Sequence, residues 1–199
     1  MELCLTTHKP LLVVGDGASG KSQLIKDMLF TQMTMFAQKV FIDHVTCSHY
    51  TTAGVLKENI ERNLVMRKIE GLDNHDAMGR TLNTVAFEAK VDSGVMEPPG
   101  VNHKLVIYLE DLHMTMVDRH QDLPAVEVLR EFLTHKEWFS VMKRAMRFID
   151  CTNVIACIDS RAEQTERISH RLLRQFVYLG VEGLDSETAI YLFTSLMKI

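Results

Sequence analysis

A glycine-rich loop that ends in a Lys-Ser pair is the residue pattern best suited to chemistry in this chain. Residues 15–22 read GDGASGKS, which fits G-x-x-x-x-G-K-[ST] without a mismatch. Such a loop points backbone N–H groups at phosphate oxygens, and a helix that begins at its end adds a positive dipole. Lys21 would reach the β- and γ-phosphates, and Ser22 would bind Mg²⁺. The predicted nucleotide-binding residues are Gly15, Asp16, Gly17, Ala18, Ser19, Gly20, Lys21 and Ser22.

The loop also raises the questions of where Asp16 points and which ligand is bound. Asp16 adds a negative charge to the phosphate site, and we expect its side chain to point to solvent. The alternative to a phosphate site is a glycine-rich turn between a strand and a helix, without any ligand. No N-K-x-D guanine element is present, so ATP or ADP with Mg²⁺ is the predicted ligand.

Two consecutive acids, Glu110 and Asp111, follow the apolar run LVIYL at residues 105–109. P-loop NTPases use one such acid to hold Mg²⁺, and ring ATPases use a second to orient the attacking water. The usual order is Asp then Glu, so Glu110 would be too long for the metal and Asp111 too short for the water. Because a displacement of about 1 Å costs on the order of 100-fold in rate, the pair favours binding over hydrolysis. The alternative is that two surface acids simply end a strand.

The elements that must position these residues alternate between strands and helices. The alternation predicts a parallel sheet with helices on both faces and a ligand crevice at the carboxyl ends of the strands. Apolar runs that end in turn residues predict strands at 11–14, 40–47, 105–109, 154–158 and 176–181. Apolar spacing and capping residues predict helices from Lys21, from Thr51 or Thr52, from Pro124 to Leu133, after Ser169, and from Asp185 or Ser186 to Leu196.

Two of these helices have a predicted core face. The first helix would bury Leu24, Ile25, Met28, Leu29 and Met33. The second would bury Val55, Leu56, Ile60, Leu64 and Val65, and would close at Gly71. Residues 71–104 show no clear period and carry EPPG at 97–100, so we expect a long loop or excursion there, with a short strand around 85–91.

The composition is that of a soluble globular protein and argues against several partners. The chain has 199 residues, 46% of them hydrophobic, and a net charge of −4, so neither nucleic acid nor a membrane is an expected partner. No apolar run approaches the roughly 18 residues that span a bilayer, and no secretory signal follows Met1, so we expect a cytosolic protein. Its four cysteines lack CxxC pairing and are expected to be reduced. His44, Cys47 and His49 are interpreted as a strand and its exit loop rather than a metal site.

The chain contains, in this order, the segments PLLVVGDGASGKSQLIKDML, VTCSHYTTAGVLKENIE, EPPG, KLVIYLEDLHM, LPAVEVLREFLTHKEWF and ISHRLLRQF. Their order and spacing resemble one AAA+ module of a dynein heavy chain, most of all the third module of the six-module motor ring. The resemblance implies an α/β fold, the large subdomain of an AAA+ P-loop NTPase, with three αβα layers and a five-stranded parallel sheet in the order 5-1-4-3-2. Residues 1–183 would form this subdomain, and 184–199 would begin the following helical region, with the lid subdomain absent.

The resemblance also assigns expected roles to residues outside the loop. Either Arg171 or Arg174 would hold the position of an arginine finger that serves a neighbouring module's site. The polar sensor at the end of the fourth strand falls near Cys157, with Ile158 at the ungapped position and Asp159 after it. An aliphatic sensor cannot hydrogen-bond to a γ-phosphate, and His113 stands where an Asn is common.

The implied partners are the neighbouring modules of the same heavy chain, and microtubules and other dynein subunits through the full-length parent. The implied location is the cytoplasm and cytoskeleton, with axonemal and cytoplasmic classes both open. We expect an ATP-binding module with weak or regulatory hydrolysis, with Asp111 as the water-orienting residue. The alternatives are a nucleotide-gated structural module without hydrolysis, and a free-standing P-loop ATPase, which would need a complete catalytic set in one chain.

Overall fold

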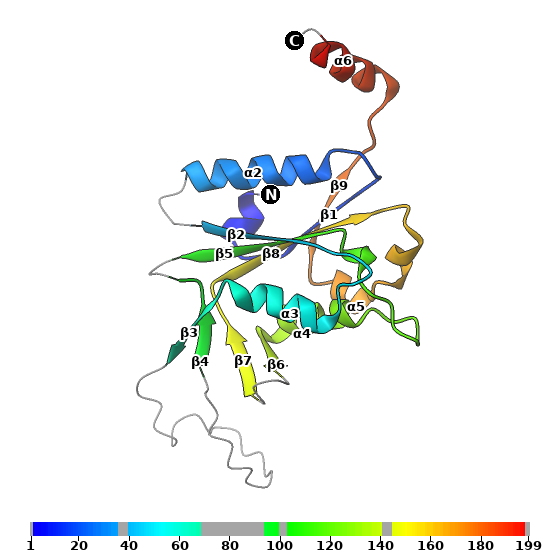
Figure 1. The fold of residues 1–199 in the computed structure, drawn as a ribbon. Coiled ribbons are helices and arrows are strands. Elements are labelled where there is room, and N and C mark those ends of the chain that lie inside the picture. Colours follow the sequence, from blue (N-terminus) through cyan, green and yellow to red (C-terminus); the bar gives the residue numbers. More distant parts are fainter. Residues whose placement is uncertain (1, 36–39, 69–93, 100–102, 141–144, 198–199) are drawn as a thin grey trace.

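The computed structural model describes residues 2–35, 40–68, 94–99, 103–140 and 145–197. A five-stranded parallel sheet lies between two layers of helices (Figure 1). Its order, β2-β5-β8-β1-β9, is the predicted order 5-1-4-3-2 read from the other edge. The predicted fold class is therefore confirmed. The strands are β1 (Leu11–Gly15), β2 (Val40–Thr46), β5 (Lys104–Glu110), β8 (Thr152–Asp159) and β9 (Val177–Val181).

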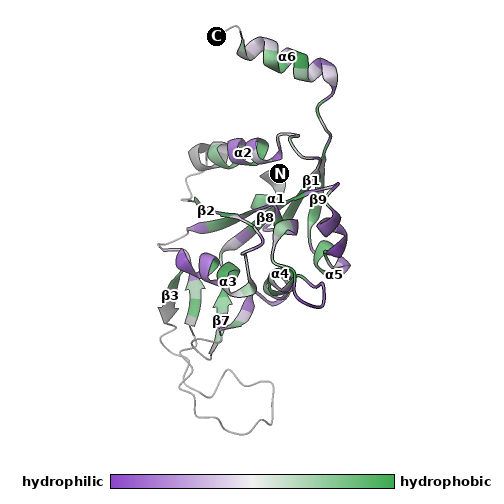
Figure 2. Cartoon of the chain, turned by 45° about the vertical axis from the view of Figure 1, so that its right-hand side comes forward, coloured by the Kyte–Doolittle hydropathy of each residue, from purple (hydrophilic) through white to green (hydrophobic). Residues whose placement is uncertain are grey.

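Helices cover both faces of this sheet. One face packs against α1 and α2, and the other against α3, α4 and α5 (Figure 1). Helix α6 projects away from the body of the fold (Figure 2). None of the described helices is both long and apolar enough to cross a membrane. The helices are α1 (Glu2–Thr6), α2 (Lys21–Met35), α3 (Ala53–Arg62), α4 (Pro124–His135), α5 (His170–Leu173) and α6 (Ser186–Leu196).

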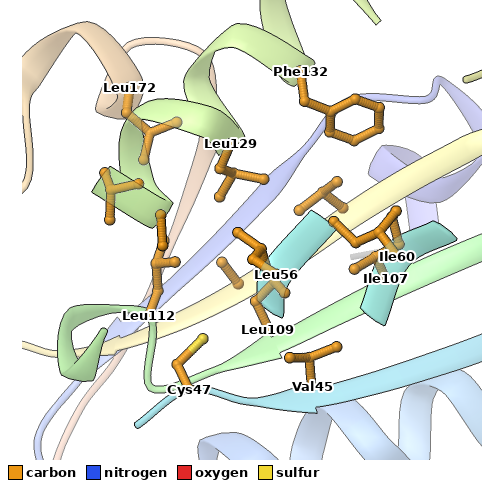
Figure 3. Packing of buried hydrophobic residues seen from close by; sticks show 14 of the residues in the cluster. Val45, Cys47, Leu56, Ile60, Ile107, Leu109, Leu112, Leu129, Phe132 and Leu172 are labelled. Carbon is orange, nitrogen blue, oxygen red and sulfur yellow. The ribbon is translucent and has the colours of Figure 1, made fainter. Parts of the chain in front are cut away.

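The middle of each central strand is apolar because its successive side chains enter two different cores. In β1, Leu11 and Val13 pack on the α2 side, whereas Leu12 packs on the side of α3 and α4. The larger core gathers side chains from β5 and from both of these helices, with Ile107 near Ile60 (Figure 3). A strand buried on both faces gives a continuous apolar run rather than an alternating pattern, which is why the sequence predicted these strands.

The local helix signals are also confirmed. The side chains of Thr52, Ser169 and Asp185 accept hydrogen bonds from backbone N–H groups in the first turns of α3, α5 and α6. Pro124 occupies the first turn of α4, where its missing N–H costs no hydrogen bond. These starts depend on residues close in sequence, so they could be predicted without the tertiary structure.

A second, four-stranded sheet in the order β3-β4-β7-β6 was not predicted. The helix expected to continue through Val65 instead ends at Arg62, because Val65 begins a strand that pairs antiparallel with β4. The predicted strand at 85–91 lies outside the described residues. The strands of this small sheet are β3 (Val65–Lys68), β4 (Gly94–Glu97), β6 (Glu137–Ser140) and β7 (Ala145–Ile149).

Three predicted core positions are wrong: Leu24, Val55 and Val65, the last of which lies in β3 and is 58% exposed. Leu24 of α2 is 43% exposed and Val55 of α3 is 41% exposed, although Ile25 and Leu56 beside them are fully buried. Leu24 and Val55 each lie at the edge of the apolar stripe of their helix, and the sheet covers only the centre of that stripe.

Trp138 of β6 attaches the small sheet to the main body. Its side chain is fully buried, its ring lies 5.2 Å from the ring of Phe132 on α4, and its Nε1–H donates to the Glu61 carboxylate of α3 at 2.8 Å. One side chain thus joins the small sheet to two helices of the larger core.

Replacing Trp138 with alanine should lower the free energy of unfolding by about 3–5 kcal/mol, since it removes a buried aromatic side chain. Phe139→Ala, at the next and 46% exposed position, is the matched control and should cost no more than about 0.5 kcal/mol. Urea unfolding of both variants is followed by circular dichroism. Tryptophan fluorescence is unsuitable because Trp138, the only tryptophan in the chain, is the residue replaced. Similar losses in the two variants would contradict the anchoring role.

Candidate functional site

The predicted phosphate loop connects the end of β1 to the start of α2, at the carboxyl edge of the sheet. Its backbone needs special conformations, since Ala18 has φ +60° and Gly20 has φ +85°. A Cβ at Gly15 would lie 2.3 Å from the carbonyl oxygen of Val181, so only glycine lets the loop begin this close to β9. The glycines therefore have a structural reason in this fold, and the loop has the strand and helix that a phosphate site requires.

The Lys21 side chain lies against its own loop. Its ammonium donates to the carbonyl oxygens of Gly15 at 2.9 Å and Asp16 at 2.5 Å, and lies 3.5 Å from Oγ of Ser19. The residue is only 7% exposed, and no carboxylate among the described residues forms an ion pair with it. A buried cation held by neutral oxygens at the N-terminus of a helix favours an anion beside it.

Ser22 and Glu110 come together from α2 and β5. The Ser22 hydroxyl donates to Oε1 of Glu110 in a short hydrogen bond, and Oε2 of Glu110 lies 2.7 Å from Nε2 of His44. Partial burial acts to raise the pKa of Glu110, but the hydrogen bonds from Ser22 and His44 outweigh it and hold that pKa below its usual value. Glu110 is therefore ionised at neutral pH.

This pair of side chains fits Mg²⁺. A hydroxyl and a carboxylate are hard oxygen ligands, and Mg²⁺ in nucleotide sites is held by one or two such groups together with phosphate oxygens and water. Ser22 lies one residue after Lys21, so a metal between Ser22 and Glu110 would lie next to the predicted phosphate position.

Asp111 follows Glu110 in a left-handed conformation, with φ +54°. Its backbone N–H donates to Sγ of Cys157 at 3.3 Å, and it occupies the N-cap position of the short helix η1 (Leu112–Met114) without a side-chain hydrogen bond to that helix. The carboxylate is half-buried at the same edge of the sheet as the phosphate loop. The turn directs the chain away from β5 immediately after Glu110.

The predicted sensor positions face opposite sides of the sheet. Ile158 is buried in the core on the side of α3 and α4. Asp159 continues β8 and turns the other way: a Cβ at Gly17 would lie 3.3 Å from its Oδ2. The side chain at the loop is therefore a carboxylate, not the isoleucine.

His113 lies buried behind this edge and is 4% exposed. Its Nδ1 accepts a hydrogen bond from the backbone N–H of Asp159 at 3.4 Å. Burial lowers the pKa of His113 below its usual value, although the nearby carboxylates of Asp111 and Asp159 act against this. The imidazole is therefore neutral at pH 7 and links the turn after β5 to the end of β8.

Asp16 does not point to solvent, so that expectation is wrong. Its Oδ1 accepts a hydrogen bond from the Ser160 hydroxyl at 2.5 Å, and its Oδ2 forms an ion pair with Arg161 at 2.5 Å. The backbone N–H of Ser160 also donates to the carbonyl of Gly15 at 3.0 Å. Ser160 and Arg161, which follow β8, thus bind the first turn of the phosphate loop, and Arg161 neutralises the charge of Asp16.

Arg171 and Arg174 lie on and directly after α5, and both are exposed. Neither arginine is among the hydrogen-bond partners of Lys21 in the described part of the chain. Sequence reasoning missed the roles of His44, Ser160 and Arg161. No local pattern marks them, since each acts through a partner at least 66 residues away.

A parallel sheet in the order 5-1-4-3-2, with a GDGASGKS loop between its first strand and the following helix, defines a P-loop nucleotide-binding fold of the AAA large-subdomain type. The chain belongs to the family described as the P-loop containing dynein motor region, whose model matches residues 1–72 and 85–183.

Similarity to several dynein heavy chains supports this family assignment. Dynein axonemal heavy chain 12 of Mus musculus is 25% identical over 197 residues, which cover 99% of this chain and 6% of that protein. Dynein heavy chain-like protein 2 of Plasmodium falciparum is 26% identical over 198 residues, 99% of this chain and 3% of that protein. The ciliary dynein beta chain of Tripneustes gratilla is 24% identical over 193 residues, 96% of this chain and 4% of that protein. The chain thus spans only a small part of the length of these relatives.

Gly15→Ala should lower the free energy of unfolding by about 1–3 kcal/mol, because the new methyl group would collide with the Val181 carbonyl and push β9 away from β1. Gly180→Ala on the neighbouring strand is the matched control, since a Cβ there meets nothing within 4 Å. Chemical denaturation of both variants measures the difference. An equal effect of the two substitutions would contradict the close approach at Gly15.

Proposed function

We propose that this chain binds Mg²⁺ and ATP or ADP through residues 15–22 and acts as a nucleotide-dependent module of a dynein heavy chain with weak hydrolysis. The observation that supports this most is the environment of Lys21. A buried ammonium rests on the carbonyl oxygens of its own loop, and Ser22 and Glu110 lie beside it as a pair of metal ligands.

Different residues of the site would bind the phosphates and the metal. The backbone N–H groups of the loop and the N-terminus of α2 bind phosphate oxygens, and Lys21 moves from its carbonyl partners to the phosphates. Ser22 and Glu110 hold Mg²⁺, which neutralises phosphate charge when bound. Arg161 keeps the Asp16 carboxylate engaged, so this acid repels the phosphates less than a free one.

Weak hydrolysis follows from the groups around the γ-phosphate position. Asp111 is one methylene shorter than the glutamate that usually orients water. Ile158 is turned into the core, and the Asp159 carboxylate near Gly17 adds negative charge where a neutral donor would help. A rate deficit of 100-fold or more needs only about 1 Å of misplacement.

The parent protein is inferred from the resemblance and from the names of the relatives. We infer a place in a motor ring, most like its third module, with residues 1–183 as the large subdomain and the neighbouring modules of the same heavy chain as partners. Arg171 and Arg174 would serve an adjacent module's site. Contact with microtubules and other dynein subunits would come through the full-length protein in the cytoskeleton, and the axonemal names of several relatives favour a ciliary location.

A nucleotide-gated structural module without any hydrolysis is the second candidate. The observation that favours it is that Ile158 lies in the core and leaves no side-chain donor at the predicted sensor position. Both candidates require nucleotide binding by Lys21 and differ only in turnover.

Lys21→Ala should abolish saturable binding of MgATP in a calorimetric titration of the chain, because it removes the charge that meets the β- and γ-phosphates. Lys26→Ala, on the exposed part of the same helix, is the control and should bind like the unmodified chain. Binding that persists in Lys21→Ala would refute the phosphate site, and equal loss in both variants would point to a general charge effect.

The order of the two acids can be tested by exchanging them in the complete heavy chain. Glu110→Asp combined with Asp111→Glu should raise single-turnover ATP cleavage at this site about 10-fold or more, because each carboxylate regains its usual reach. Asp111→Asn, the matched control, should remove whatever cleavage remains. An unchanged rate in the exchanged variant would favour the structural module.

A further inference from the structure

His44 is a side chain of β2 that no motif singled out as part of the phosphate site. In the register of the sheet it lies opposite Tyr108 of β5, two residues before Glu110. Its imidazole is stacked on the Tyr108 ring, with 4.8 Å between the ring centroids and 9° between the planes. Tyr108 is itself only 1% exposed. The imidazole is therefore stacked on a buried aromatic ring.

The stacked imidazole faces the Glu110 carboxylate. Its Nε2 lies 2.7 Å from Oε2 of Glu110. An ionised carboxylate can only accept hydrogen bonds, so Nε2 must carry the proton and donate it. Oε1 of the same carboxylate accepts from the Ser22 hydroxyl. Both oxygens of Glu110 are thus held, one by the phosphate-loop helix and one by the neighbouring strand.

The longer side chain of Glu110 gives this second contact its importance. Compared with an aspartate, a glutamate has one more rotatable bond between backbone and carboxylate, so it has more ways to turn away from a metal. A single hydrogen bond to Ser22 leaves rotation about that bond free. A second contact at Oε2, from a ring stacked on the buried Tyr108, restricts this rotation.

We propose that His44 is the positioning residue for the metal-binding carboxylate: its Nε2–H fixes Glu110 against Ser22 and so compensates for a glutamate at the position where an aspartate is usual. The inference rests on the proposed nucleotide site. It adds a residue on β2 to the loop on α2 and the acid on β5. His44 acts through Glu110 and does not contact the nucleotide.

The first test compares substitutions at His44 that keep the reach of the N–H donor, shorten it or remove the donor. The amide nitrogen of Gln is as many bonds from Cβ as Nε2 of histidine, whereas that of Asn is one bond shorter. Binding of the ATP analogue AMP-PNP to the chain is measured with Mg²⁺ and with EDTA, and the ratio of the two affinities is the metal-dependent gain.

His44→Ala and His44→Asn should each reduce this gain about 10-fold, in the range found for groups that orient metal ligands. His44→Gln should retain most of it, and the affinity in EDTA should stay the same in all three. His49→Ala, an exposed histidine in the loop after β2, is the control and should change neither value. An unchanged gain in His44→Ala, a gain lost equally in His44→Gln, or no metal-dependent gain in the unmodified chain would overturn the proposal.

The second test needs no nucleotide. The ¹⁵N chemical shift of His44 Nε2 is measured by NMR in the unmodified chain, in Glu110→Ala and in Asp111→Ala. The shift should change in Glu110→Ala, where the acceptor is lost, and stay the same in Asp111→Ala. Identical spectra for all three would overturn the contact. If the unmodified chain binds no AMP-PNP, the nucleotide site has failed, and the NMR shift alone still decides whether His44 holds Glu110.

Discussion

The parallel alignment of β1, β5 and β8, buried between two layers of helices, is the constraint on which the site depends. Their carboxyl ends reach the same edge of the sheet, so the phosphate loop, Glu110 and Asp159 lie together although they are far apart in sequence. The alignment is stable because the side chains of each strand fill both cores alternately. Gly15 completes it, since only a residue without a Cβ lets β9 pass this close to the end of β1.

The charges at this edge are balanced in a way that suits an anionic ligand. Lys21 has no carboxylate partner among the described residues and rests on neutral carbonyl oxygens. Two of the nearby acids do have partners, since Asp16 is paired with Arg161 and Glu110 is held by His44. A cation that is not neutralised by its own protein, with acids engaged elsewhere, leaves the loop attractive to phosphate.

Nucleotide binding and nucleotide cleavage need different groups at this edge of the sheet, and the chain has more of the groups that binding needs. Binding depends on the loop, Lys21 and one metal-holding acid, and all three have a defined place in the fold. Cleavage depends on sub-ångström placement of a water and on a neutral donor at the γ-phosphate. Ile158 is turned into the core, and Asp111 is one methylene shorter than glutamate; both observations are the basis of the proposed weak hydrolysis.

The sequence alone determined the five strands of the main sheet, the phosphate loop and the helix starts, because each depends on residues close together or on strands long enough to show a pattern. The strand order and the finer fold class were expectations from the family resemblance. Only the tertiary structure decided the small sheet, the end of α3 at Arg62, the ion pair of Asp16 and the contact of His44 with Glu110. Three of the four strands in the small sheet have only four residues, which carry too little pattern to be recognised. The side-chain partners, 66 residues apart or more, become neighbours only when the parallel strands align.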